Sequence, residues 1–396
     1  MHETLKPEKK TVLDHVTGRT VHCFTDRGSN CSPYFNSYAW TADSEWFFFL
    51  RADGDGEWVM ACEYATGALR LLAGPYPLGP SESQVLWPTL NATPGARSAT
   101  YVQDSALWRV ELDQPGSAEL VARLPGRSGG DTDVSSDGRW HVLPVFHASE
   151  DAWRELAKVG WAVDQAIARC GFASELVRVD LTNGRIESLW TEEQAMVDHI
   201  SVNPKDPDLI LFCHEGARPY QYGRMFLRRV GGSASRPLRD QRSGRVWVTH
   251  ERWFPDGERI SYHGEYRGLP LFGDSASHEK RHFFFGILDV ARDLPREYVM
   301  SDPARHPWHC PPSPDGRHIV TDGRAGHGGL DLLTPDDTSG LCRIEPLCSL
   351  SSDDAPLGVA EQWRERDPIW SPDGKKILFR TARQGAVHVY AVEVES

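Results

Sequence analysis

The sequence predicts an all-β fold, a seven-bladed β-propeller, on three observations. A short turn signature recurs seven times along the chain, and the copies begin 42 to 68 residues apart, as blades of a propeller do. Most copies are followed within a few residues by a run rich in β-branched and aromatic residues, which is typical of a turn that feeds a strand. No low-complexity linker divides the chain. We therefore expect one propeller domain over residues 1–396.

The seven signatures share turn-forming chemistry. In the clearest copies a proline presets φ at the second position, an aspartate bonds its own backbone, and a glycine accepts the positive φ that a tight turn requires. The copies begin at Thr41, Thr93, Ser135, Asn203, Phe254, Ser313 and Ser371.

A second turn predicts how the ring closes. Thr66-Gly67 and Asn183-Gly184 each open a further strand, so we expect them to join the third and fourth strands of their blades. The last strand, residues 387–393, stops where this turn should follow, and residues 16–24 supply a turn and a strand at the other end. We expect the N-terminal strand to close the last blade and remove its free edge.

Two insertions interrupt the blade spacing. Apolar residues recur at roughly helical spacing within residues 149–173, so a helical insertion near 150–173 is expected over one face of the ring. Residues 266–281 contain Gly, Pro, Ser and Asp with little periodicity, which indicates a loop.

Composition excludes several function classes. The net charge of −13 offers no electrostatic footprint for nucleic acid, and no Lys/Arg run indicates a membrane surface. The charged start lacks a signal peptide and no run of about 18 apolar residues occurs, so we expect a cytoplasmic protein. The eight cysteines form no C-x-x-C pair and are expected to be mostly buried thiols.

Polar clusters lie just before several turn signatures, where the innermost strand of a blade faces the central channel. His250 precedes one signature, His309 another, and residues 362–367 a third; a further cluster begins at His214. Because inner strands converge on the propeller axis, we expect these side chains to meet at one mouth of the channel.

These clusters resemble the oligogalacturonate lyase family, intracellular seven-bladed propellers that split short uronides by β-elimination. The matching stretches are His214-Glu215-Gly216 with Arg224, Thr249-His250-Glu251 with Trp253, and Tyr262-His263-Gly264. The resemblance implies that His250 is the base that abstracts a proton and that Arg224 serves the substrate carboxylate. His214 and His263 are further residues expected on the substrate side.

The same resemblance implies a divalent metal, manganese first, held by three histidines and a glutamine. His309 and Gln362 match two of those ligands, but the other two histidines are replaced by Glu365 and Asp367. Carboxylates bind manganese, calcium or magnesium well, and residues 365 and 367 share one face of a strand. We therefore expect an oxygen-rich metal site and a small acidic oligosaccharide as substrate, with nucleic acid and membranes excluded as partners.

Alternatives remain open from the residues alone. His250, His309 and Arg224 could serve inter-blade packing, and Glu365 and Asp367 could form a salt-bridged rim with Arg364 and Arg366. The alternative function is a non-catalytic platform similar to the TolB propeller, which binds protein or sugar. A hydrolase is disfavoured because no Gly-x-Ser-x-Gly elbow occurs.

Overall fold

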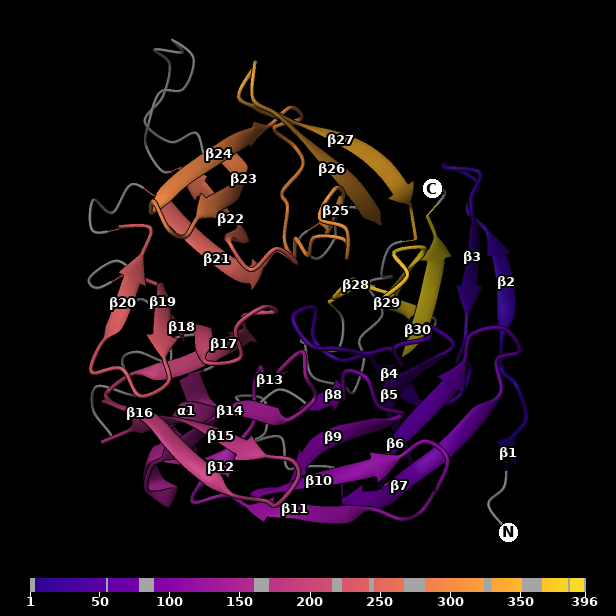
Figure 1. The fold of residues 1–396 in the computed structure, drawn as a ribbon. Coiled ribbons are helices and arrows are strands. Elements are labelled where there is room, and N and C mark those ends of the chain that lie inside the picture. Colours follow the sequence, from indigo (N-terminus) through magenta and orange to yellow (C-terminus); the bar gives the residue numbers. More distant parts are fainter. Residues whose placement is uncertain are drawn as a thin grey trace.

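The structure, a computed structural model, describes residues 4–54, 56–77, 89–159, 171–215, 223–241, 246–266, 282–323, 329–350, 365–383 and 385–394. Within these residues the strands form seven antiparallel blades arranged in a ring around a central channel (Figure 1). The all-β, seven-bladed propeller is therefore confirmed.

The first four blades each have their own sheet. Blade one contains β4 (Ser29–Cys31), β5 (Trp46–Asp53), β6 (Gly56–Glu63) and β7 (Leu69–Pro77), with β1 (Thr4–Leu5) on its outer edge. Blade two contains β8 (Leu90–Ala92), β9 (Ser98–Gln103), β10 (Ala106–Glu111) and β11 (Glu119–Arg123). Blade three contains β12 (Arg127–Ser128) and β13 (Asp133–Val134), both paired with β14 (Trp140–His147), then β15 (Ala173–Asp180) and β16 (Ile186–Glu193). Blade four contains β17 (Met196–Val202), β18 (Leu209–Glu215), β19 (Met225–Arg229) and β20 (Ser235–Leu238).

The last three blades are linked to their neighbours or to the N-terminus. Blade five contains β21 (Val246–Trp253), β22 (Arg259–Tyr266), β23 (His282–Asp289) and β24 (Leu294–Met300). Blade six contains β25 (Ile319–Asp322), β26 (Leu330–Asp336) and β27 (Leu341–Cys348), and β27 pairs in parallel with β24. Blade seven contains β28 (Ile369–Trp370), β29 (Lys376–Arg383) and β30 (Ala386–Glu393), followed by β3 (Thr20–Cys23) and β2 (Lys10–Leu13).

Each turn signature forms a β-turn at the end of an innermost strand. In all seven the backbone N–H of the fourth residue donates to the carbonyl of the first, as Gly316 does to Ser313 over 2.8 Å. Asp315 explains the recurring sequence: its Oδ1 accepts from the Ser313 hydroxyl and from the backbone of Arg317. Gly316 has φ +69°, which is why glycine recurs at this position.

The N-terminus closes the ring as expected, because β3 pairs antiparallel with β30 through Val21, His22 and Cys23. Figure 1 shows these two strands side by side although they lie at opposite ends of the chain. One detail differs from the prediction: the turn at Gly18 joins β3 to an additional outer strand, β2. Sequence periodicity did not reveal β2 because all but one of its residues are exposed.

The helical insertion is confirmed by α1 (Glu150–Val159), which begins with two acidic residues and follows β14. Residues 160–170 and the expected loop at 267–281 lie outside the described residues. Among the helices that are described, none is long and apolar enough to span a membrane. The seven cysteines in the described part are buried and unpaired, as predicted.

The hydrophobic core lies between the blades. Phe48 of β5, Ala61 of β6 and Tyr101 of β9 belong to one cluster that joins blades one and two. Similar clusters join blades three to four and five to six. Because every blade is packed on both faces, the inner strands are held at fixed positions around the channel.

Residues 32–37 cross the channel and divide it. Asn36 donates to the carbonyl of Ile200, Ser37 to that of Thr132, and Arg252 donates to the carbonyl of Phe35. We call residues 32–37 the channel plug. Tyr34 and Phe35 of the plug are buried against imidazole rings on one side, whereas Phe35 also lines a cavity of about 290 Å³ beside the turn signatures.

Candidate active site

Five polar side chains from neighbouring blades occupy one equivalent position, four residues before the turn signature of their blade. They are Asp131, His199, His250, His309 and Asp367. All five are buried, and three of them, His199, His250 and Asp367, have positive φ values of 51°, 55° and 44°. At His199 and His250 the strand pairing shifts register, and such bulges redirect a side chain. The inner strands thus direct these groups into the channel.

His250 is held as a neutral imidazole. Its Nδ1 lies 2.8 Å from His263 Nε2 and 3.3 Å from the carbonyl oxygen of Trp308. Because a carbonyl oxygen can only accept, a hydrogen bond to Trp308 requires the tautomer that is protonated on Nδ1, and in that tautomer the lone pair is on Nε2. Burial, together with the surrounding imidazoles, lowers the pKa of His250 well below its usual value. The ring is therefore neutral near neutral pH, and one of its nitrogens keeps an unprotonated lone pair.

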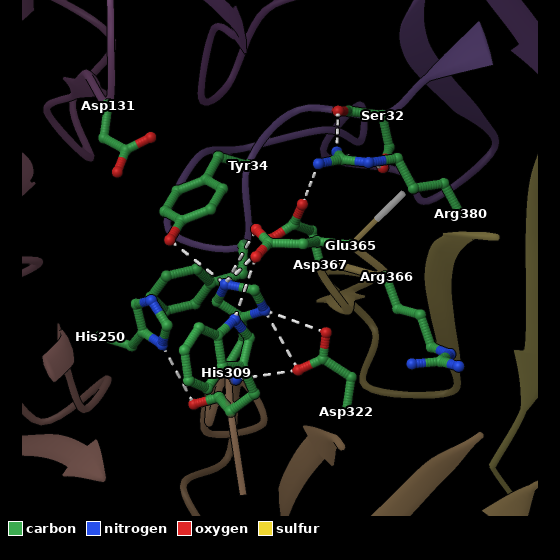
Figure 2. Close-up of polar contacts among 12 residues, drawn as sticks. Ser32, Tyr34, Asp131, His250, His309, Asp322, Glu365, Arg366, Asp367 and Arg380 are labelled. Atoms are coloured by element: carbon green, nitrogen blue, oxygen red, sulfur yellow. Dashed lines mark hydrogen bonds and ion pairs between the residues drawn. The ribbon is translucent and has the colours of Figure 1, made fainter. Parts of the chain in front are cut away.

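His309 lies beside His250, with ring centroids 4.4 Å apart. Its Nδ1 contacts both oxygens of Asp322 at 3.1 and 3.0 Å, and Asp322 also accepts the backbone N–H of His309. The Nε2 atom faces the Tyr34 hydroxyl at 3.2 Å and Asp367 Oδ1 at 3.3 Å (Figure 2). Burial opposes protonation of His309, but Asp322 and Asp367 outweigh it and raise its pKa to about 9.

Glu365 and Asp367 complete a donor set with His309. One ligand atom from each lies within 4.8 Å of the others, the span expected around one cation. Burial raises the pKa of Glu365 to about 8, because the charged carboxylate loses its hydration and the positive charge of His309 does not compensate for that loss. Asp322 orients His309 from behind, as carboxylates do behind metal-bound histidines. These residues fit a divalent cation.

The alternative to a metal site was a salt-bridged rim in which Asp367 pairs with Arg366. The structure shows no ion pair between these two residues. Asp367 pairs instead with Arg380 of β29, and Arg380 also donates to the carbonyl of Ser32 at the start of the plug. Arg366 donates to the carbonyl of Gly323. Figure 2 shows Arg380 on the far side of Asp367 from His309.

Arg224 lies in a second charged cluster, where it forms ion pairs with the carboxylates of Glu215 and Glu251. Its Nη2 lies 2.6 Å from Glu215 Oε1, and its Nε donates to Glu251 Oε2 over 3.1 Å. His199 Nε2 is 3.2 Å from the same Glu215 oxygen. Burial opposes ionisation of Glu215, but Arg224 outweighs it and holds the pKa of Glu215 well below its usual value.

A second group of potential ligands, His199, Cys213 and Glu215, lies in that cluster. Burial raises the pKa of the Cys213 thiol well above its usual value, so the thiolate needed for metal binding is disfavoured. Glu215 is already neutralised by Arg224. We therefore assign no metal to this group.

The structure brings most of the predicted site residues together, but not all. His250, His263 and His309 adjoin one another, with Glu365 and Asp367 beside His309. His214 points elsewhere: its Nε2 lies 2.7 Å from Glu192 Oε2 and its ring packs on Phe226. Gln362 lies outside the described residues.

Several residues of the site were missed by sequence reasoning. Asp131 and His199 share the offset from the turn signature that singled out His250 and His309, so that offset could have identified them. Tyr34, Asp322 and Arg380 carry no such signal, because each reaches the site from another strand or from the plug.

Comparison with known proteins gives a consistent result. Residues 91–270 match a protein family described as oligogalacturonate lyase. The chain is 30% identical over 171 residues to an oligogalacturonide lyase of Pectobacterium atrosepticum and 28% identical over 156 residues to an oligogalacturonate lyase of Dickeya dadantii. These alignments span 43% and 39% of the chain and the same shares of the two relatives, less than half of each protein.

Two solved structures share the fold over the whole chain. An oligogalacturonate lyase from Vibrio parahaemolyticus superimposes with a TM-score of 0.78 and 19% identity, covering 100% of this chain and 99% of the other. An oligogalacturonate lyase in complex with manganese gives a TM-score of 0.80 and 21% identity, covering 100% and 98%. At these identities the likeness establishes the propeller fold alone.

Proposed function

We propose that this chain, which belongs to the oligogalacturonate lyase family, is a lyase that cleaves short uronic-acid oligosaccharides by β-elimination, acting as one propeller domain over residues 1–396. Oligogalacturonides are the first candidate substrates, because both curated relatives carry that activity in their names. Another uronide is the next candidate, since Glu365 and Asp367 replace two histidines of the family pattern.

The arrangement of His250 carries this proposal. Its Nδ1 is fixed by the Trp308 carbonyl, its Nε2 is left for a substrate, and its low pKa keeps the ring neutral. In a uronide the proton on C5 is acidified by the adjacent carboxylate, and a neutral imidazole in reach of it serves as the base. His263 stabilises the orientation of His250 through the 2.8 Å contact.

The charge of the site supports a bound divalent cation. The channel gathers many carboxylates, so an acidic sugar would be repelled unless further positive charge were present. His309, Glu365 and Asp367 would hold the cation, with Gln362 as a fourth ligand implied by the family pattern. When bound, such a cation neutralises the uronate and stabilises the negative charge that develops as the C5 proton leaves. Manganese is favoured by the family resemblance, and the oxygen-rich donors also suit calcium or magnesium.

Arg224 and His214 are proposed on the substrate side by the same family pattern. Arg224 keeps its charge, because Glu215 and Glu251 outweigh its burial and raise its pKa well above its usual value. Its clamp between two carboxylates means that a substrate carboxylate would have to compete with Glu215 for the guanidinium. Its main electrostatic effect on the site is to neutralise Glu215 and Glu251.

The test is an ultraviolet assay for the conjugated double bond of an unsaturated uronide. Purified protein is incubated with a panel of short uronic-acid oligomers, with added manganese or calcium and after chelation. A rise that needs metal and disappears in His250→Ala is the expected result and identifies the substrate. No rise on any uronide with any metal would contradict the proposal and favour a binding platform.

A further inference from the structure

Asp131 presents an unusual carboxyl group to the channel. Its side chain is 1% exposed, and neither Oδ1 nor Oδ2 has a hydrogen-bonding partner among the described residues. The closest polar group recorded is His199 Nε2, 3.5 Å from Oδ2 and too distant for a hydrogen bond. A carboxyl group buried in this way favours its neutral, protonated form.

The backbone around Asp131 is held by hydrogen bonds, so the direction of its side chain is fixed. Asp198 Oδ1 accepts the backbone N–H of Asp131 over 2.8 Å and that of His199 over 3.0 Å. Gly130 allows this approach, since a Cβ there would lie 2.8 Å from Asp198 Oδ1. One carboxylate therefore sets the direction of two inner side chains on adjacent blades.

Asp131 and the base lie on two sides of His199. The His199 ring stacks on His250 with centroids 5.4 Å apart, and its Nε2 faces Asp131. In Figure 2 Asp131 lies across Tyr34 from Glu365 and Asp367, away from the proposed metal ligands. Asp131 and His250 therefore both adjoin His199 in the same part of the channel.

Burial and the neighbouring Asp198 raise the pKa of Asp131 well above its usual range, so the carboxyl group is held in its protonated form. A protonated carboxyl group can donate a proton, as a general acid must.

We propose that Asp131 is the general acid that protonates the C4 oxygen of the departing sugar, an assignment that rests on the proposed lyase function. His250 Nε2 takes the C5 proton, and the electron pair of the C5–H bond forms the C4=C5 double bond. The C4–O bond breaks with its electron pair on oxygen, and the Asp131 hydroxyl gives its proton to that oxygen. The leaving sugar departs as a neutral alcohol, with Asp131 left as a carboxylate and His250 as an imidazolium.

The test compares two leaving groups in Asp131→Asn. On a natural uronide oligomer the variant should lose about 100- to 10,000-fold in kcat, the usual contribution of a general acid. On a uronide that carries 4-nitrophenoxy at C4, a leaving group that needs no proton, the loss should stay within about tenfold. Asp131→Ser repeats the test with another side chain, and thermal melting checks that both variants fold.

Two comparison variants sharpen the result. Glu57→Gln removes another carboxyl whose pKa burial raises, to about 7, but on β6 and outside the channel, so it should leave both substrates unaffected. Tyr34→Phe removes the phenol hydroxyl that lies 3.2 Å from His309 Nε2 and is another possible proton donor in the channel. Equal losses on both substrates in Asp131→Asn, or a leaving-group effect in Tyr34→Phe instead, would overturn the assignment while the lyase function stands. A wild-type protein inactive on every uronide would instead refute the lyase function.

Discussion

The imidazole rings of His199 and His250 are stacked, with 10° between their planes, although they belong to different blades. Both residues have positive φ and both sit at a shift of strand register, so each blade makes the same local distortion at the same point. In these two neighbouring blades the same bulge directs a histidine side chain into the channel. The candidate site is built on this repeated distortion.

Asp322 should control metal affinity without being a ligand. Asp322→Asn removes the negative charge that orients His309 through Nδ1, so the affinity for manganese should fall about 10- to 100-fold. Isothermal titration calorimetry measures the change. Asp331→Asn is the matched control, because Asp331 is also buried but pairs with Arg305. Unchanged affinity in Asp322→Asn would remove His309 from the metal site.

Arg380 should make Asp367 essential for stability even in the absence of metal. Asp367→Ala leaves the buried guanidinium without its carboxylate, and breaking such a pair costs about 3 to 5 kcal/mol. Urea unfolding in the presence of a chelator measures the loss. The double variant Asp367→Leu with Arg380→Met should recover most of it. A double variant no more stable than the single one would show that the pair does not explain the loss.

Glu365 should set the preference among metals. Glu365→His supplies an imidazole where the family pattern has one, so affinity for zinc should rise relative to calcium. Competition titrations with both ions give the ratio. Glu258→His, an exposed substitution beside a turn signature, is the control and should leave the ratio unchanged.

His141 should make the fold sensitive to acid. Its two ring nitrogens contact Thr100 and Thr132 inside the core, and burial lowers its pKa to about 3. The unfolded chain therefore takes up a proton below about pH 6.5 while the folded protein does not, so stability falls as the pH drops. Between pH 6.5 and 4.5 the loss should be about 2 kcal/mol.

The measurement for His141 is urea unfolding across that pH range in the wild type and in His141→Gln. The variant lacks the titrating ring, so its stability should fall by about 2 kcal/mol less over the same range. His318→Gln, at an exposed histidine, should follow the wild type. Parallel curves for the wild type and His141→Gln would refute the prediction.

The sequence allowed the ring to be predicted because the propeller repeat is local. Each Ser-Pro-Asp-Gly turn is formed by contacts within a few residues, as Asp315 shows, so the turn can be recognised from the sequence alone. The same periodicity located His250 and His309. It could not identify Tyr34 as a neighbour of His309, because 275 residues separate the two. Nor could it identify Arg380, which reaches Asp367 from another strand of the same blade. Nor could it show that Arg224 is clamped by Glu215 and Glu251, which depends on how two blades meet.

Tyr34 and Phe35 belong to a segment that lies across the central channel of the propeller. Residues 32–37 are hydrogen-bonded to three blades across the middle of the ring, beside the histidines. A substrate stopped by these residues would have to leave by the end of the channel through which it entered. The two oligosaccharide products would then leave through the same opening. Release of the slower product would limit the rate at which the next substrate molecule binds.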